Sequence, residues 1–257
     1  MKKICAVLGI VVFILSCKSA DIVPPPTMAD QNTKGHWIIR PMDNAVIIIG
    51  VSSPMRKRDE EVDSAKEDAA KKAAMYYDVY GKIETPTSEG GSFFENINDS
   101  RLEVVYNKNY KQYIDKLTYD PNNDVLITKE AVFIRFKLPA VAQQVKYTTK
   151  FEKDGSPVWV NNRQLPKVDG YISAVGFSQK QMRLKEAVYK ATEAAVASMI
   201  ETQSTKITES VVDKSVGTRR VSYSVSEGRL QNFHVIEIWV QPKTNNVYTL
   251  AIGKPVK

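Results

Sequence analysis

The chain has 257 residues, of which 43% are hydrophobic and 25% charged, with a formal net charge of +7. This is the composition of an ordinary globular protein, and it excludes collagen, long coiled coils and wholesale disorder. The sequence contains only two histidines, His36 and His234, and two cysteines, Cys5 and Cys17. It therefore lacks the residues for a zinc site, an iron–sulfur cluster, a disulfide framework or a cysteine–histidine dyad.

The N-terminus has the layout of a bacterial lipoprotein signal peptide. Two lysines precede an uncharged, mostly apolar run over 4–15, and a small serine then stands before Cys17. The run is too short to cross a membrane, which needs about 20 apolar residues. The segment Ile14–Cys17 resembles the lipobox, in which the cysteine receives diacylglycerol and the preceding peptide is removed. We predict residues 1–16 to be the signal peptide and Cys17 to be the acylated, membrane-anchored N-terminus.

The segment after the cysteine is predicted to be a tether. Residues 17–34 are polar and contain Pro24–Pro26, which favours extended polyproline geometry over a packed element. A docking site for a proline-recognising partner is the alternative interpretation.

Two segments of the chain match when the sequence is shifted by 126 positions. In each, a short apolar stretch with a tryptophan is followed by an apolar run containing Gly-x-Ser and then by an alanine-rich stretch. We interpret the match as a tandem duplication, and chance similarity between alanine-rich helices is the alternative. The coinciding positions are Ile48–Ser52 with Ala174–Ser178, Ala65 with Ala191 and Ala69 with Ala195, preceded by Trp37 and Trp159.

Each copy predicts a strand followed by an amphipathic helix. The runs 45–51 and 171–177 are bounded by turn residues and are typical of strands. After them, apolar residues recur at three- and four-residue steps over 62–80 and 184–198, which predicts helices with an alanine-rich core face. The expected helix caps are Ser53 with Pro54 for the first helix, and Ser178 with Gln181 in a capping box for the second.

The remainder of each copy predicts further strands. We expect an exposed loop over 81–100 and a helix over 101–118. A β pattern follows over 125–138 in the first copy. In the second copy, 235–240 and 247–252 are separated by turn residues and predict a terminal hairpin.

The glycines and serines at the strand ends do not form a recognised catalytic motif. Gly50 and Gly176 lack phosphate-loop spacing, so we expect them to allow a strand-end conformation or a close approach of a helix. Ser52 and Ser178 follow them in a strand–Ser–helix arrangement, but the G-x-S-x-G spacing of a nucleophile elbow is absent. Helix capping is the preferred interpretation.

Other polar clusters also have structural interpretations. The run 120–124 could offer oxygen ligands to a cation but lacks the spacing of an EF-hand, and a β-turn is preferred. The basic cluster 56–58 is neutralised by the acidic residues 59–61, and a second basic pair at 219–220 is too short to specify a partner. The tryptophans are expected to be core anchors rather than a ligand cage. They are Trp37, Trp159 and Trp239.

The second copy resembles the LPP20-type envelope lipoprotein domain, which is related to the N-terminal domain of a flagellar assembly protein. The match covers roughly 155–253, whereas the first copy is divergent and has Val132–Leu138 in place of the terminal Trp-Val and Tyr-Leu segments. The residues that carry the resemblance are Pro157–Val160, Pro166, Gly170–Gly176, Ile238–Val240 and Val247–Leu250.

We therefore predict an α+β protein of two tandem small modules, 35–145 and 150–257. Each module is a strand, an amphipathic alanine-rich helix and further antiparallel strands packed on that helix. The resemblance implies a non-enzymatic envelope component that binds or scaffolds an envelope protein in the periplasm or at the outer membrane. It implies no catalytic residue, metal or cofactor.

Two alternatives stay open for the function. One is an assembly factor of a flagellar or other envelope complex, and the other is a lipid-binding or membrane-perturbing lipoprotein that uses its amphipathic helices. An envelope hydrolase is the least favoured class, and nucleic-acid binding is not expected because there is no basic stripe. Lys18 after the predicted acylated cysteine, in place of an aspartate, favours the outer membrane over the inner one.

Overall fold

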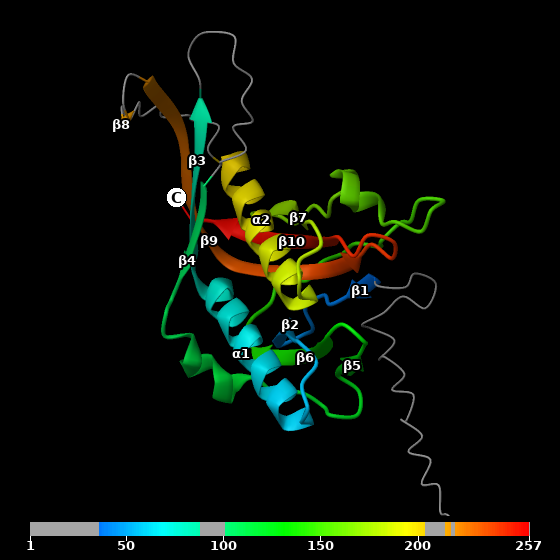
Figure 1. Ribbon diagram of the computed structural model, residues 1–257. Helices are drawn as coiled ribbons and strands as arrows, with labels where there is room; N and C mark the ends of the chain where they lie inside the picture. Colours follow the sequence, from blue (N-terminus) through cyan, green and yellow to red (C-terminus); the bar gives the residue numbers. More distant parts are fainter. Residues whose placement is uncertain (1–35, 88–100, 204–213, 217–218, 257) are drawn as a thin grey trace, which may run out of the picture.

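Two antiparallel sheets and two long helices form the fold in a computed structural model (Figure 1). The structure describes residues 36–87, 101–203, 214–216 and 219–256. The long helices are α1 (Arg58–Tyr77) and α2 (Leu184–Gln203), and the short 3-10 helices are η1 (Tyr110–Lys116) and η2 (Val158–Asn161). The predicted α+β class is confirmed.

The larger sheet is built around one long strand, β9. Its main order is β4-β3-β9-β10-β7, and β1 and β8 also pair with β9, all antiparallel. The first part of β9 pairs with β3, and its last part pairs with β1. The strands are β1 (His36–Ile38), β3 (Val79–Thr87), β4 (Arg101–Tyr106), β7 (Ile172–Ser178), β8 (Lys214–Val216), β9 (Arg219–Val240) and β10 (Val247–Pro255).

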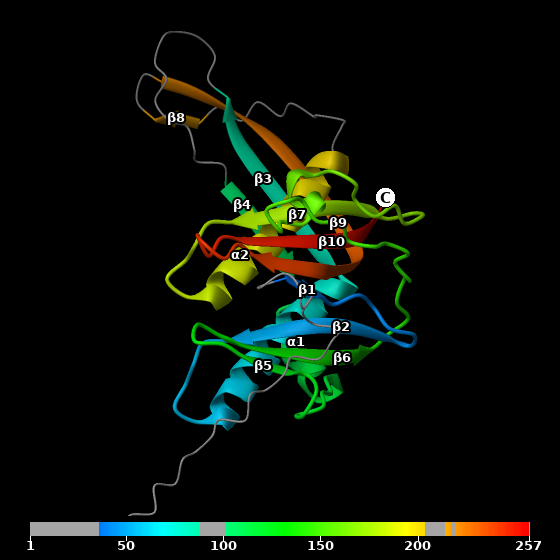
Figure 2. The same ribbon diagram turned by 90° about the vertical axis from the view of Figure 1, so that its right-hand side faces the viewer.

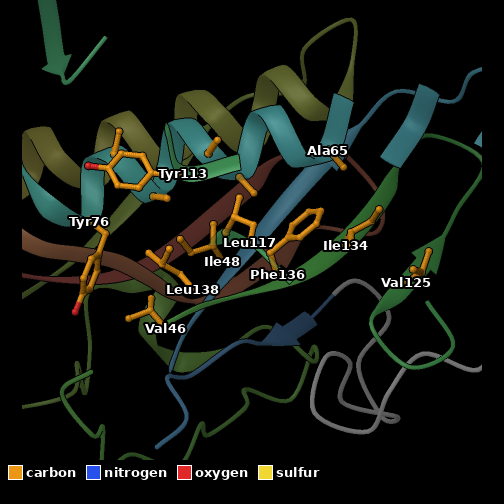
Figure 3. Packing of buried hydrophobic residues seen from close by; sticks show 14 of the residues in the cluster. Val46, Ile48, Ala65, Tyr76, Tyr113, Leu117, Val125, Ile134, Phe136 and Leu138 are labelled. Carbon is orange, nitrogen blue, oxygen red and sulfur yellow. The ribbon is translucent and has the colours of Figure 1, made fainter. Parts of the chain in front are cut away.

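The smaller sheet has the order β2-β6-β5 and lies beside the end of the larger sheet that carries β1 (Figure 2). One face, with Val46 and Ile48, packs on α1, as Figure 3 shows. The opposite face, with Ile47 and Ile49, shares a buried cluster with residues of β1, β9 and α2. The small sheet is therefore buried on both faces. Its strands are β2 (Ala45–Ser52), β5 (Val125–Ile127) and β6 (Val132–Pro139).

Each long helix packs closely on the strand that precedes it. A Cβ on Gly50 would lie 2.1 Å from the carbonyl oxygen of Ala65, and a Cβ on Gly176 would lie 1.8 Å from that of Ala191. Only glycine allows the backbones to approach this closely. The close approach expected at these two glycines is confirmed, and the predicted strands at 45–51 and 171–177 are present within one residue.

The predicted helix caps are wrong. Helix α1 begins at Arg58 after Lys57, which makes no side-chain cap bond. Helix α2 begins at Leu184, and the Ser178 hydroxyl donates to the carbonyl of Gln179 instead of reaching a helix N–H. Loops of several residues separate each strand from its helix, so a serine at the strand end is too far away to cap.

The predictions for 81–100 and 101–118 are also wrong where the structure describes them. Residues 81–87 belong to β3, and 101–106 form β4, followed by η1 rather than by an α-helix. In β3 the buried positions Val79, Gly81 and Ile83 alternate with more exposed ones. This alternation is the strand signal, and the glycine and proline content of the segment obscured it.

Strands from both halves of the chain share the larger sheet. β1, β3 and β4 come from the first predicted module, and β7, β9 and β10 come from the second. The hairpin predicted at the C-terminus is confirmed as β9 and β10. Hydrogen-bonded strands therefore join the two predicted modules in one sheet. The boundary between the modules stays a prediction.

Candidate functional site

The predicted lipidation site, Cys17, lies outside the described residues, as do the signal peptide and the tether. The chain that would follow the tether enters the structure at β1. The position of β1 is therefore the nearest structural reference point to the predicted anchor.

A groove of about 310 Å³ opens beside β1, where the larger sheet meets the smaller one. Residues from the end of β1, from the turn that follows it and from β2 line the groove. Strand β6 pairs with β2 and extends its wall. The groove is lined by Ile38, Ile39, Arg40, Met42, Ile47, Arg135 and Lys137.

A buried carboxylate holds Arg40 at the groove. Glu237 on β9 is fully buried and accepts a hydrogen bond from the Arg40 guanidinium at 2.6 Å. The same carboxylate accepts from the Thr149 hydroxyl at 2.5 Å and from the Trp159 indole N–H at 2.7 Å. The Arg40 guanidinium also lies 5.4 Å from the ring centroid of Tyr147, at cation–π distance. These contacts fix the position of the Arg40 guanidinium.

A second buried carboxylate holds Arg135. Asp124 is fully buried and accepts from Nε of Arg135 at 2.6 Å, with a second contact from the Arg135 Nη2. The other oxygen of Asp124 accepts from the backbone N–H of Asp120 at 2.8 Å. Because a buried carboxylate without partners would be costly, this pairing stabilises the guanidinium in one orientation.

Lys137 is the third cation of the groove. It lies two residues after Arg135 on β6, so both side chains project from the same face of the sheet. In the register it faces Ile47 of β2. Lys137 is half-buried, and no ion-pair partner for its Nζ occurs within 4 Å among the described residues.

The apolar floor of the groove adjoins a small cavity between the two sheets. Ile39 and Ile47 line both spaces. The cavity has room for about one water, with a volume of about 20 Å³. Its polar lining residues are Lys72, Thr192 and His234.

The polar groups of this cavity differ in how many hydrogen-bond partners they have. Lys72 donates from Nζ to the carbonyl of Ile49 at 2.8 Å and to Asp68 at 2.7 Å. His234 must donate from Nδ1, because its partner at 2.8 Å is the carbonyl oxygen of Asn232. Its buried Nε2 has no partner among the described residues. Burial lowers the pKa of His234 to about 4, so the ring is neutral at pH 7.

The candidate residues weighed from sequence do not form a catalytic group. Ser52 and Ser178 are buried, and each hydroxyl donates to the carbonyl of the next residue. The Asp120 carboxylate accepts from Asn123 and Asn122, which lowers its pKa and fits the predicted turn. Over the described ranges, no cluster of three or more His, Cys, Asp or Glu residues could hold a metal ion.

The aromatic and basic predictions have clear outcomes. The tryptophans are core residues, as predicted, since Trp37, Trp159 and Trp239 are at most 5% exposed. In the cluster at 56–58, Arg58 pairs with Glu61 and Lys57 with Glu60, as expected for a neutralised surface. The side chains of 219–220 lie outside the described structure.

Sequence reasoning missed the groove and its buried carboxylates. Two signals were available in the sequence. Arg135 and Lys137 alternate with apolar residues on β6, which places both cations on one face. Glu237 is the one carboxylate within an apolar run of β9, which indicates a buried charge that needs partners.

Comparison with family models, with curated proteins and with solved structures finds no match for this chain. Among the helices of the described structure, none is both long enough and apolar enough to cross a membrane.

Proposed function

We propose that this protein is a bacterial cell-envelope lipoprotein, anchored by acyl chains on Cys17, that acts by binding or scaffolding rather than by catalysis. The observation that carries the proposal is the N-terminal pattern of two lysines, an apolar run and Ile14–Cys17. Two or more acyl chains give stable anchoring, so the folded part needs no membrane-spanning helix. The outer membrane is the proposed site, with the folded part in the periplasm or at the cell surface.

The groove beside β1 supports a binding role. Two of its cations, Arg40 and Arg135, are held by buried carboxylates and are therefore positioned before any ligand arrives, which lowers the entropic cost of binding. Lys137 adds a further positive charge to the mouth. Concave sites with an apolar lining and a few fixed polar groups are typical of ligand binding.

The buried helix faces favour this role over a membrane-perturbing one. The alanine stripes that the sequence predicted as amphipathic faces are fully buried. A leaflet-inserting helix would need such a face to be exposed. The buried stripe residues are Ala65, Ala69, Ala73, Ala191 and Ala195.

The anchor is tested by metabolic labelling with a clickable fatty acid. Cells express the full chain, a Cys17→Ala variant or a Cys5→Ala variant, and the labelled protein is followed through membrane fractionation. Wild type and Cys5→Ala are expected to carry label in the membrane fraction, whereas Cys17→Ala carries none. Equal labelling of Cys17→Ala would exclude the proposed anchor.

The binding role is tested in the same cells by cross-linking before affinity purification. A reproducible envelope protein or ligand recovered with wild type would support the proposal. The Lys137→Gln variant shows whether the groove takes part, and Lys243→Gln, in the exposed β9–β10 turn, is the matched control. Turnover of a substrate by the purified chain would contradict the non-catalytic assignment.

A further inference from the structure

We propose that the groove beside β1 binds a single-chain anionic lipid, a fatty acid, with its carboxylate at the three cations and its chain along the isoleucine floor. This inference rests on the proposed binding role of the groove and names its ligand class. It follows from the charge at the mouth, the apolar lining and the size of the space.

The ion pairs beside the groove leave one cation without a direct carboxylate partner. Arg40 and Arg135 are paired with the buried carboxylates of Glu237 and Asp124, whereas Lys137 has no carboxylate oxygen within 4 Å of its Nζ among the described residues. A ligand carboxylate would supply that direct partner. A carboxylate removed from water needs charge-assisted hydrogen bonds to offset its desolvation, and guanidinium and ammonium groups provide them.

Donors are available at the mouth for such a ligand. The Nε–H of Arg40 is buried and has no hydrogen-bond partner among the described residues. The ammonium of Lys137 is also without an ion-pair partner there. Its charge helps to lower the pKa of the nearby Asp120, but the oxygens of that carboxylate accept from Asn122 and Asn123.

The rest of the groove suits an aliphatic chain. Ile38, Ile39 and Ile47 present branched apolar side chains, and Met42, which is 48% exposed, can adapt its shape to a ligand at the outer rim. Ile39 and Ile47 also line the small cavity between the sheets, which has room for only about one water. An acyl chain would therefore lie along the groove itself.

The size of the groove favours one short chain. A volume of about 310 Å³ is at the lower end of the range for ligand pockets, about 300–1,000 Å³. A two-chain phospholipid is too large for it. Sugar phosphates and free phosphate would leave the isoleucine floor uncovered, so neither explains the apolar lining.

The test uses the purified full chain and a dodecanoate probe that carries a photoreactive diazirine and an alkyne. We expect cross-links to map to 38–47 and 135–137, with competition by dodecanoate but not by its methyl ester. Lys137→Gln is expected to weaken binding about tenfold, the effect of losing one charge-assisted bond. The exposed Lys243→Gln serves as the matched control and is expected to bind as wild type does.

A second variant guards against effects on folding. Met42→Glu places a negative charge at a solvent-exposed position of the rim and is expected to reduce labelling at least as strongly as Lys137→Gln. Cross-links spread over the surface, equal competition by the methyl ester, or unchanged labelling of both variants would overturn the proposal. Competition only by peptides with a C-terminal carboxylate would also overturn it in favour of a peptide site.

The labelling is repeated on the Cys17→Ala full chain, so that the groove is examined without acylation. Acyl labelling that persists in Cys17→Ala, together with retained groove labelling, would refute the anchor alone. An intact anchor without groove labelling would refute the lipid ligand alone.

Discussion

Replacing Gly176 with alanine should separate α2 from β7. The added Cβ would lie 1.8 Å from the carbonyl oxygen of Ala191 and 2.5 Å from the amide nitrogen of Ala195. Both are backbone atoms of α2, so no side chain can rotate to make room. An ordinary contact needs about 3.5 Å, and the helix must therefore retreat by about 1.7 Å. Such a shift also strains the 3.0 Å hydrogen bond from the Thr249 hydroxyl to the same carbonyl.

The expected cost combines these two effects. Overpacking in a core costs about 1–3 kcal/mol, and one lost buried hydrogen bond costs about 1 kcal/mol. We expect Gly176→Ala to lower the free energy of unfolding by about 3 kcal/mol. For a chain of this size, that lowers the melting temperature by about 10 °C. Urea denaturation followed by tryptophan fluorescence measures the change.

Gly253→Ala is the matched control. Gly253 lies on β10 opposite Ile172 of β7, and its added Cβ would meet the flexible Met199 sulfur at 3.1 Å. We expect a change below about 1 kcal/mol, since a side-chain end can move whereas a helix backbone cannot. A Gly176→Ala protein as stable as Gly253→Ala would refute the argument from close backbone approach.

Two further predictions concern buried charge and pH. Glu237→Gln should lower the free energy of unfolding by about 3 kcal/mol, because it leaves Arg40 without its charge partner and presents an amide donor to the Trp159 N–H. Urea denaturation of this variant beside an exposed Glu→Gln variant tests the prediction. Equal stabilities of the two variants would contradict it. His234 has its pKa lowered to about 4 in the folded state, so the unfolded state takes up the proton first as pH falls below about 6.5. The free energy of unfolding should therefore be about 2 kcal/mol lower at pH 5 than at pH 7. The His234→Phe variant should lack this contribution to the pH dependence.

The parts of the fold that were predictable are those with a strong local pattern. The alanine-rich periodicity predicted both long helices, and α1 and α2 are found in those segments, although α1 ends at Tyr77 and not at residue 80, because β3 begins at Val79. The strands before them were predictable because short apolar runs stand between clear turn residues. In both cases the signal lies within about twenty consecutive residues.

Strand β3 could not be recognised because its stability comes from distant partners. It pairs with β9, some 140 residues later in the chain, and with β4. Pro86 and Gly81 weaken the local strand signal. Pro86 lies beyond the part of β3 that pairs with β4, so its missing N–H breaks no hydrogen bond to β4. Long-range pairing of this kind overrides local propensity.

The groove was not predictable for the same reason. Arg40 and Glu237 are 197 residues apart in sequence, and their pairing exists only once β1 has joined β9. Arg40 alone resembles an ordinary surface charge. The sequence could indicate that Glu237 needs a partner, but not which cation supplies it.

The two strand–helix units share their local geometry but differ where they meet. Gly50 and Gly176 contact their helices in the same way, and α1 and α2 have 20 residues each at the 126-residue shift. The difference lies at the edge of β2, which is buried against the larger sheet. There Asp68 accepts from the Val51 N–H at 2.9 Å, and Lys72 donates to the Ile49 carbonyl at 2.8 Å.

Asp68 and Lys72 supply the hydrogen bonds that water would give to an exposed strand edge. A buried edge with unsatisfied N–H and C=O groups would be costly, so the docking of the small sheet onto the larger one depends on them. The corresponding positions in α2 are Ala194, which has no polar side-chain group, and Ser198, whose side chain is uncharged and much shorter than that of lysine. The divergence of the first unit is therefore concentrated at the contact between the sheets, the same contact at whose rim the groove opens.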